Sequence, residues 1–94
     1  MVFHTEAEAE YLQAMDWYAS HNPRVAAEFL EAVQRTAELV AQSPLRWPRG
    51  LAGTRSYLIH RFPYRLIYRP IDGGIQIVAV AHASRRSGYW RDRR

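Results

Sequence analysis

The sequence predicts a single α+β domain in which two antiparallel helices pack on a small antiparallel sheet. Two stretches between residues 6 and 42 carry apolar side chains at helical spacing, and each begins with capping residues. Two later runs rich in Ile, Val and Tyr flank Asp72-Gly73-Gly74, the pattern of a tight β-hairpin. A chain of 94 residues is long enough for one compact core. We therefore expect residues 1–94 to form one domain.

The first expected helix follows a short N-terminal strand at Val2-Phe3-His4. Thr5 and Glu8 have the spacing of a capping box, in which Thr5 caps the helix and Glu8 bonds back to the Thr5 N–H. The apolar residues that follow predict a helix from about Glu6 to Ser20. These apolar residues are Ala7, Tyr11, Ala14, Met15 and Tyr18.

The second expected helix begins at Asn22-Pro23, because asparagine is a good N-cap and proline suits the first helical position. It should end before Ser43-Pro44. The connection between the helices is short, which predicts an antiparallel helical hairpin. The face that should meet the sheet consists of Ala26, Phe29, Leu30, Val33, Ala37 and Val40.

Three strands are expected after the helices. Residues 45–53 are typical of a loop, Thr54 to Phe62 of a strand, and Pro63 of a bend. The hairpin of residues 64–82 supplies two more strands, so with the N-terminal strand the sheet should have three to four strands. Residues 83–94 are basic and aromatic, and we expect either a tail across the sheet or a short helix.

The hairpin should present one apolar face and one mixed face. If its loop has two residues, alternation places Arg65 and His82 together on the mixed face, whereas a three-residue loop would change the pairing. The face on the helices would carry Leu66, Tyr68, Ile77, Ala79 and Ala81. The mixed face, which we expect to be the functional surface, would carry Arg65, Ile67, Arg69, Gln76, Val78, Val80 and His82.

Charge is divided unevenly between the two halves of the chain. Residues 1–45 contain two arginines against seven acidic residues, a net charge of −5. Residues 46–94 contain eleven arginines against two acidic residues, a net charge of +9. Arginine offers a planar fork of donors that suits phosphate and carboxylate groups. The basic half therefore predicts a polyanionic or acidic partner, the alternative being a solvated, arginine-rich surface.

Several kinds of site are not predicted. Cysteine is absent, and the sequence shows no zinc-ligand spacing, nucleophile elbow or phosphate-binding glycine loop. We therefore expect no cofactor and no metal. Neither a long apolar run nor a signal-peptide pattern is found, which predicts a cytoplasmic protein with no membrane segment.

Four stretches, in the right order, resemble the RelE/ParE superfamily of small toxins from type II toxin–antitoxin systems. They are the acidic helical hairpin, Phe62 to Tyr68 (FPYRLIY), the apolar strand that ends in Ala79-Val80-Ala81-His82, and Arg85 followed by Tyr89-Trp90. The resemblance covers nearly the whole chain. It implies a compact α+β toxin that a cognate antitoxin neutralises in a hetero-oligomer. The target stays open, because RelE-like members cleave ribosome-bound mRNA and ParE-like members poison DNA gyrase.

The ribonuclease pattern of that superfamily is matched only in part. Its strand arginine matches Arg65, and its late tyrosine matches Tyr89. Its paired lysines, however, fall near Ser56 and Leu58, which cannot replace them. This departure favours a ParE-like toxin over a RelE-like ribonuclease.

The end of the last strand also departs from the ribonuclease pattern. The arginine that follows this strand in the superfamily falls near Ala83, although Arg85 and Arg86 are close by. Related toxins place a histidine near the strand end, where His82 stands. The resemblance therefore leaves a nucleolytic mechanism open.

Metal-free RNA cleavage needs a base for the 2′-hydroxyl, a cation at the phosphorane and an acid for the leaving oxygen. On the mixed face, His82 is the only candidate base near neutral pH, since histidine alone ordinarily titrates there. Arg65 or Arg85 would stabilise charge, and Tyr89 would orient or stack on a base. The structural alternatives are a strand-end histidine bonded to a neighbour and an aromatic tail that simply packs on the sheet.

The expected partner is an antitoxin whose acidic, amphipathic tail folds on the mixed face or along the helical hairpin. The target would be DNA gyrase or ribosome-bound mRNA. A non-toxic basic nucleic-acid-binding module and an inactive relative are the other readings. The expected partner-binding residues are Arg65, Ile67, Arg69, Val78, Val80, Arg86 and Trp90.

Overall fold

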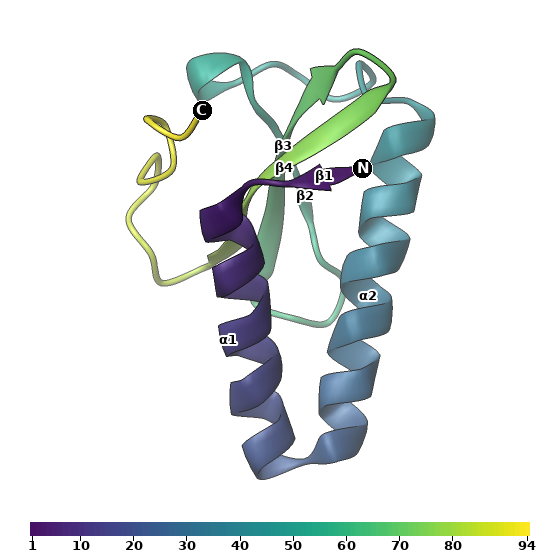
Figure 1. The fold of residues 1–94 in the computed structure, drawn as a ribbon, viewed down its shortest axis with the longest axis vertical. Coiled ribbons are helices and arrows are strands. Elements are labelled where there is room, and N and C mark those ends of the chain that lie inside the picture. The colour runs from purple at the N-terminus through teal and green to yellow at the C-terminus, as the bar shows by residue number, and fades with distance from the viewer.

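The protein is described here by a computed structural model of all 94 residues, in which a helical hairpin packs against a four-stranded sheet (Figure 1). The two helices run antiparallel, and residues 83–94 lie on the side of the first helix, away from the second. In chain order the elements are β1 (Val2–Phe3), α1 (Thr5–His21), α2 (Pro23–Gln42), the 3₁₀ turn η1 (Leu51–Gly53), β2 (Arg55–Leu58), β3 (Tyr64–Ile71) and β4 (Gly74–His82).

The helix boundaries follow from their caps. Asn22 Oδ1 accepts a hydrogen bond of 3.0 Å from the Arg24 N–H, and Pro23 is the first residue of α2, as predicted. The predicted cap of α1 is wrong by one residue. His4, in extended conformation, accepts a 3.1 Å bond from the Glu6 N–H through Nδ1, so Thr5 already belongs to the helix.

The sheet has the strand order β1-β4-β3-β2 and is mixed. β2, β3 and β4 pair antiparallel, as expected, whereas β1 pairs parallel to β4 through Val2 with Gln76 and Phe3 with Ile77. β2 is shorter than the predicted strand from Thr54 to Phe62. Residues 59–63 instead form a turn, in which Arg61 has a φ of +73°.

The hairpin has the two-residue loop that the glycines predict, because Ile71 pairs with Gly74. Farther from the loop, the register shifts: Ile67 pairs with Ala79 and Tyr68 with Ile77, which leaves Val78 as a bulge. An extra residue in one strand reverses the side-chain parity beyond it. The predicted face assignment is therefore correct near the loop and wrong at the other end of β4.

The main core lies between the helices and the sheet. Phe29 and Val33 of α2 are fully buried against it, as predicted, together with Leu66 and Tyr68 of β3. The hydroxyl of Tyr68 donates a 2.9 Å hydrogen bond to the Pro44 carbonyl, so this buried phenol is satisfied.

A second apolar cluster lies apart from the main core and consists of Ile67, Val78, Ala79 and Ala81. Tyr89 and Trp90 pack against it. Residues 83–94 are therefore a covering segment built of turns, and not the short helix that was one of the two expectations.

No helix in the structure combines the length and the apolarity needed to span a bilayer.

Candidate functional site

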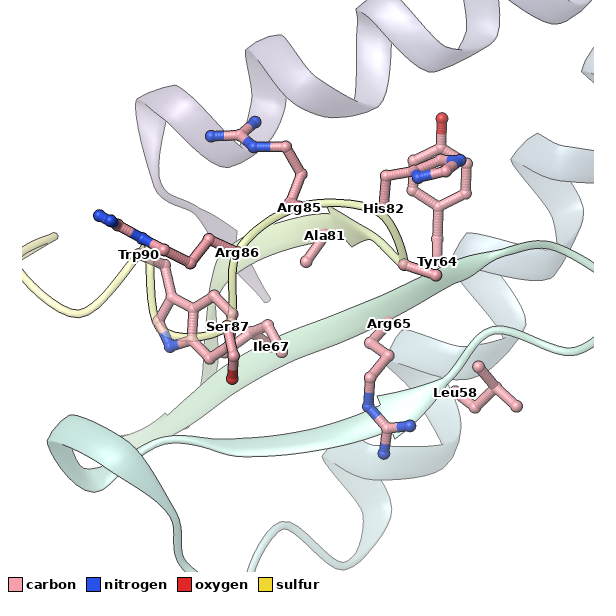
Figure 2. Close-up of a pocket in the computed structure, with 11 residues that line it drawn as sticks. Leu58, Tyr64, Arg65, Ile67, Ala81, His82, Arg85, Arg86, Ser87 and Trp90 are labelled. Atoms are coloured by element: carbon pink, nitrogen blue, oxygen red, sulfur yellow. The ribbon is translucent and has the colours of Figure 1, made fainter.

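A cavity of about 290 Å³ opens where the ends of β3 and β4 that lie away from the hairpin loop meet residues 83–94 (Figure 2). Ile67, Ala81 and Trp90 give it apolar walls. None of its eleven lining residues is acidic. The basic residues that line it are Arg65, His82, Arg85 and Arg86.

Arg65 lies on β3 opposite Ala81 of β4, and its side chain is exposed. Its only hydrogen-bond partner is the hydroxyl of Ser56, at 3.3 and 3.4 Å from two guanidinium nitrogens. Figure 2 shows the Arg65 side chain directed away from His82. The guanidinium of Arg65 is therefore free to meet an anion.

His82 ends β4, paired with Tyr64, and the two rings lie perpendicular with centroids 5.0 Å apart. Its Nδ1 accepts a 2.9 Å hydrogen bond from the Ser84 N–H and lies 2.8 Å from the Ser84 hydroxyl. Because a backbone N–H can only donate, Nδ1 carries the lone pair, and the neutral ring holds its proton on Nε2. The nitrogen that could act as a base is thus already engaged.

The expectation that Arg65 and His82 share one face is wrong. The bulge at Val78 reverses the parity of β4, which places Val80 with the helix-side core and Ala81 on the other face, opposite Arg65. Arg65 and His82 line the same cavity, but their side chains lie on different faces of the sheet. Arg65 and the His82 ring therefore do not form a base and a phosphate-stabilising cation on one surface. Arg85 lines another hollow together with His82, but its guanidinium stacks on Tyr89.

Tyr89 is not free for substrate either. Its hydroxyl donates a 2.6 Å hydrogen bond to Glu10 Oε2. Burial, the hydrogen bond to Glu10 and the Glu10 charge together hold the pKa of this phenol far above its ordinary value. The guanidinium carbon of Arg85 lies 3.8 Å from the centre of the Tyr89 ring, and one of its nitrogens lies 3.9 Å from the Glu10 carboxylate.

Glu10 of α1 is the residue that the sequence reasoning missed. Its Oε1 accepts 3.0 Å hydrogen bonds from the Val80 N–H and from Arg93, and its Oε2 accepts from Tyr89 and, at 3.0 Å, from Arg93. These contacts join α1, β4 and residues 83–94. The hydrogen bond to Glu10 is the main reason why the pKa of Arg93 is raised.

The sequence did carry a signal for Glu10. It lies three residues after Ala7 and four before Ala14, and both alanines are buried. Residues at these spacings share one helix face. An acidic residue on the buried stripe of a helix requires partners, because a desolvated, unpaired carboxylate is costly.

Three of the predicted partner-binding residues, Ile67, Val78 and Val80, are only 1%, 0% and 2% exposed. The expectation that they form an open apolar surface is wrong: Tyr89 and Trp90 cover the first two, and Val80 packs in the main core.

The other predicted partner-binding residues are accessible to different degrees. Arg69 donates a 2.6 Å hydrogen bond to the Arg93 carbonyl and so holds the chain's own C-terminal segment. Arg65 and Arg86 are exposed and Trp90 is half-buried, and these three line the cavity.

The family model for the ParE toxin of the type II toxin–antitoxin system, parDE, matches residues 1–87. The chain belongs to this family. The ParE-family toxin also resembles a solved structure, the chromosomal ParDE toxin–antitoxin system from P. aeruginosa, with a TM-score of 0.73. Identity is 19%, over 85% of this chain and 90% of that chain, so this likeness shows the fold alone. No curated protein matches the chain in sequence.

The site of this ParE-family toxin is better suited to binding than to proton transfer. Ile67, Ala81 and Trp90 give the cavity apolar walls, and Arg65 and Arg86 form no ion pair. His82, at the rim, accepts a hydrogen bond from the Ser84 N–H. No group of three or more His, Cys, Asp or Glu side chains lies together as metal ligands would. The resemblance to the RelE/ParE superfamily inferred from the sequence is confirmed.

Proposed function

We propose that this ParE-family toxin is neutralised by a cognate antitoxin, with which it forms a hetero-oligomer, and that it acts on DNA gyrase without cutting RNA. The toxin class follows from the family. The non-nucleolytic mechanism is supported by one observation above all, the hydrogen bond from the Ser84 N–H to His82 Nδ1. A general base must offer a lone pair to the proton that it removes.

The other groups of a ribonuclease mechanism also have different partners. The Tyr89 hydroxyl donates a hydrogen bond to Glu10, and Arg85 stacks on Tyr89. Arg65 is free, but it lies on the opposite face of the sheet from the His82 ring. A cation without a base can hold a phosphate but does not activate a 2′-hydroxyl.

The second candidate is a RelE-like mRNA endoribonuclease. One observation favours this candidate: Arg65, His82 and Arg85 line one cavity. A rotation of the His82 ring away from Ser84 would then have to precede catalysis. The third candidate, a non-toxic basic nucleic-acid-binding module, is favoured only by the arginine-rich half of the chain.

Expression of the wild type, His82→Ala and His60→Ala in a bacterial host separates these candidates. His60 is an exposed histidine in the β2–β3 turn and serves as the matched control. For a gyrase poison we expect all three chains to arrest growth, DNA breaks to accumulate, and purified gyrase to lose supercoiling activity.

The alternative outcomes are distinct. Codon-phased mRNA cuts that persist in His60→Ala and fall by about 10²–10⁴-fold in His82→Ala would establish the ribonuclease and overturn our proposal. Normal growth on expression of the wild type, combined with salt-sensitive RNA or DNA binding, would favour the binding module.

A further inference from the structure

We propose that the 290 Å³ cavity is the anchor point of the antitoxin and receives one bulky apolar side chain from an acidic, extended or helical segment. This inference rests on the proposed function, since it names the surface that the antitoxin would cover. It differs from the sequence-based expectation, because the bare apolar face assumed there is covered by Tyr89 and Trp90. The opening that remains is the cavity beside Trp90.

The apolar part of the site fits a side chain. Ile67 and Ala81 come from neighbouring strands, and Trp90 closes one side. Leu58, at the end of β2, also lines the cavity and is 54% exposed, so a partner that fills the cavity would remove this leucine from water. Burial of a Leu-sized side chain on each partner is a typical source of binding energy at interface anchors.

The charged side chains at the rim of the cavity favour an acidic partner. Neither Arg65 nor Arg86 takes part in any of the four ion pairs in the structure. Both side chains are exposed beside an opening that contains no acidic residue. Unpaired guanidinium groups next to an apolar pocket are complementary to carboxylates that flank an apolar anchor.

A peptide fits the cavity better than a nucleotide does. Pockets for small-molecule ligands span about 300–1,000 Å³, and this cavity lies at the lower limit. The rings that line it are already packed: Tyr64 and His82 lie against each other with centroids 5.0 Å apart, and Trp90 packs on the second apolar cluster. The arginines alone would accept phosphate or carboxylate equally.

A second hollow of about 270 Å³ continues the first and shares Arg65, Ile67, Ser87 and Trp90 with it. It extends the groove to Leu51 and also has no acidic lining residue. The two hollows would therefore hold a continuous segment that passes Trp90, which lines both of them.

The test measures, by isothermal titration calorimetry, the affinity of the full-length toxin for the antitoxin encoded in the neighbouring reading frame. Ala81→Leu fills the cavity from its own wall, and we expect binding to weaken at least about tenfold. Ala27→Leu, on the exposed face of α2, is the matched control and should bind as the wild type does.

Charge reversal provides a second variant that is not at risk of misfolding. Arg86→Glu, at the exposed rim, should weaken binding at least about tenfold and reduce its salt dependence. Arg91→Glu makes the same change in an exposed residue that does not line the cavity, and it should have a much smaller effect.

Wild-type affinity in both Ala81→Leu and Arg86→Glu would overturn the inference and leave the proposed function intact. A wild-type toxin that binds no antitoxin would overturn both, and growth arrest that persists when the antitoxin is co-expressed would identify this case independently. If a single-stranded 20-nucleotide RNA binds the wild type but not Ala81→Leu, while antitoxin binding is the same in both, the cavity is a nucleic-acid site.

Discussion

Arg93 forms two hydrogen bonds of 3.0 Å with the two carboxylate oxygens of Glu10, which lies 83 residues earlier in the chain. Both side chains are largely buried, at 11% and 14% exposure. Arg93 also donates to the Val78 carbonyl at 3.0 Å. This pair fastens residues 83–94 to α1 and to β4, and the covered apolar cluster depends on it.

Removal of one member of this pair should destabilise the protein strongly. Glu10→Ala leaves Arg93, the Tyr89 hydroxyl and the Val80 N–H without their acceptor, and breaking a buried pair in this way costs about 3–5 kcal/mol. Urea unfolding measures the loss. Glu8→Ala, an exposed acid on the same helix, is the control and should change stability by less than about 0.5 kcal/mol. Equal losses for the two variants would contradict the role of Glu10.

Stability should fall at alkaline pH. Burial raises the pKa values of Tyr11, Tyr18, Tyr64 and Tyr68, and burial with Glu10 raises that of Tyr89 most. Because the pKa of each phenol is higher in the folded state, the unfolded chain releases the phenol proton at a lower pH than the folded chain does. The stabilisation is therefore complete below the unfolded value of about 10 and is lost as the pH rises through the folded values.

Urea unfolding between pH 8 and pH 11 tests this dependence. Each phenol that is ionised only in the unfolded chain contributes a slope of about 1.4 kcal/mol per pH unit. Tyr89→Phe should reduce the slope above pH 10, although it also lowers stability at neutral pH. An unchanged slope in Tyr89→Phe would show that this phenol titrates normally.

Arg61 should tolerate glycine better than alanine. Its φ of +73° lies in the left-handed region, which costs a residue with a side chain roughly 1–2 kcal/mol. Arg61→Gly should raise stability by about 0.5–1 kcal/mol after the entropy cost of glycine. Arg61→Ala retains the backbone strain and should show no such gain. Thermal unfolding distinguishes the two variants, and equal midpoints would argue against strain in this turn.

Phe29→Ala tests the packing of α2 on the sheet. The ring is fully buried and contacts the rings of Tyr18, Phe62 and Tyr64 at centroid distances of 5.1–5.2 Å. Its removal should cost about 3–5 kcal/mol in urea unfolding. Leu12→Ala, on the exposed side of α1, should cost far less. A loss below about 1 kcal/mol for Phe29→Ala would mean that the helix packs differently.

Local chemistry was enough to predict the helices and the hairpin loop. Asn22 and Pro23 define a helix start through their own side chains, and the glycines after Asp72 define a tight turn. The bulge at Val78 could not be predicted in this way. Residues 77–81 are apolar at every position, so the sequence there has no alternation from which a register could be determined.

The site was predicted less well than the fold, also for a physical reason. Arg65, His82, Arg85, Arg86 and Trp90 were selected by residue type, and they do line one cavity. Their hydrogen bonds depend on register and on partners distant in sequence, which no local pattern encodes. The contact between Glu10 and Arg93 is the clearest case, since it joins the two ends of the chain.

The Glu10–Arg93 pair also determines where the sheet stops. β1 covers only Gln76 and Ile77 of β4. Beyond β1, Glu10 accepts from the Val80 N–H and Arg93 donates to the Val78 carbonyl, as the backbone of a neighbouring strand would. Unlike a strand, an ion pair offers no further row of N–H and C=O groups, and an open row of this kind is what recruits another chain. Growth of the sheet by edge-to-edge association is therefore blocked on this side by two charges.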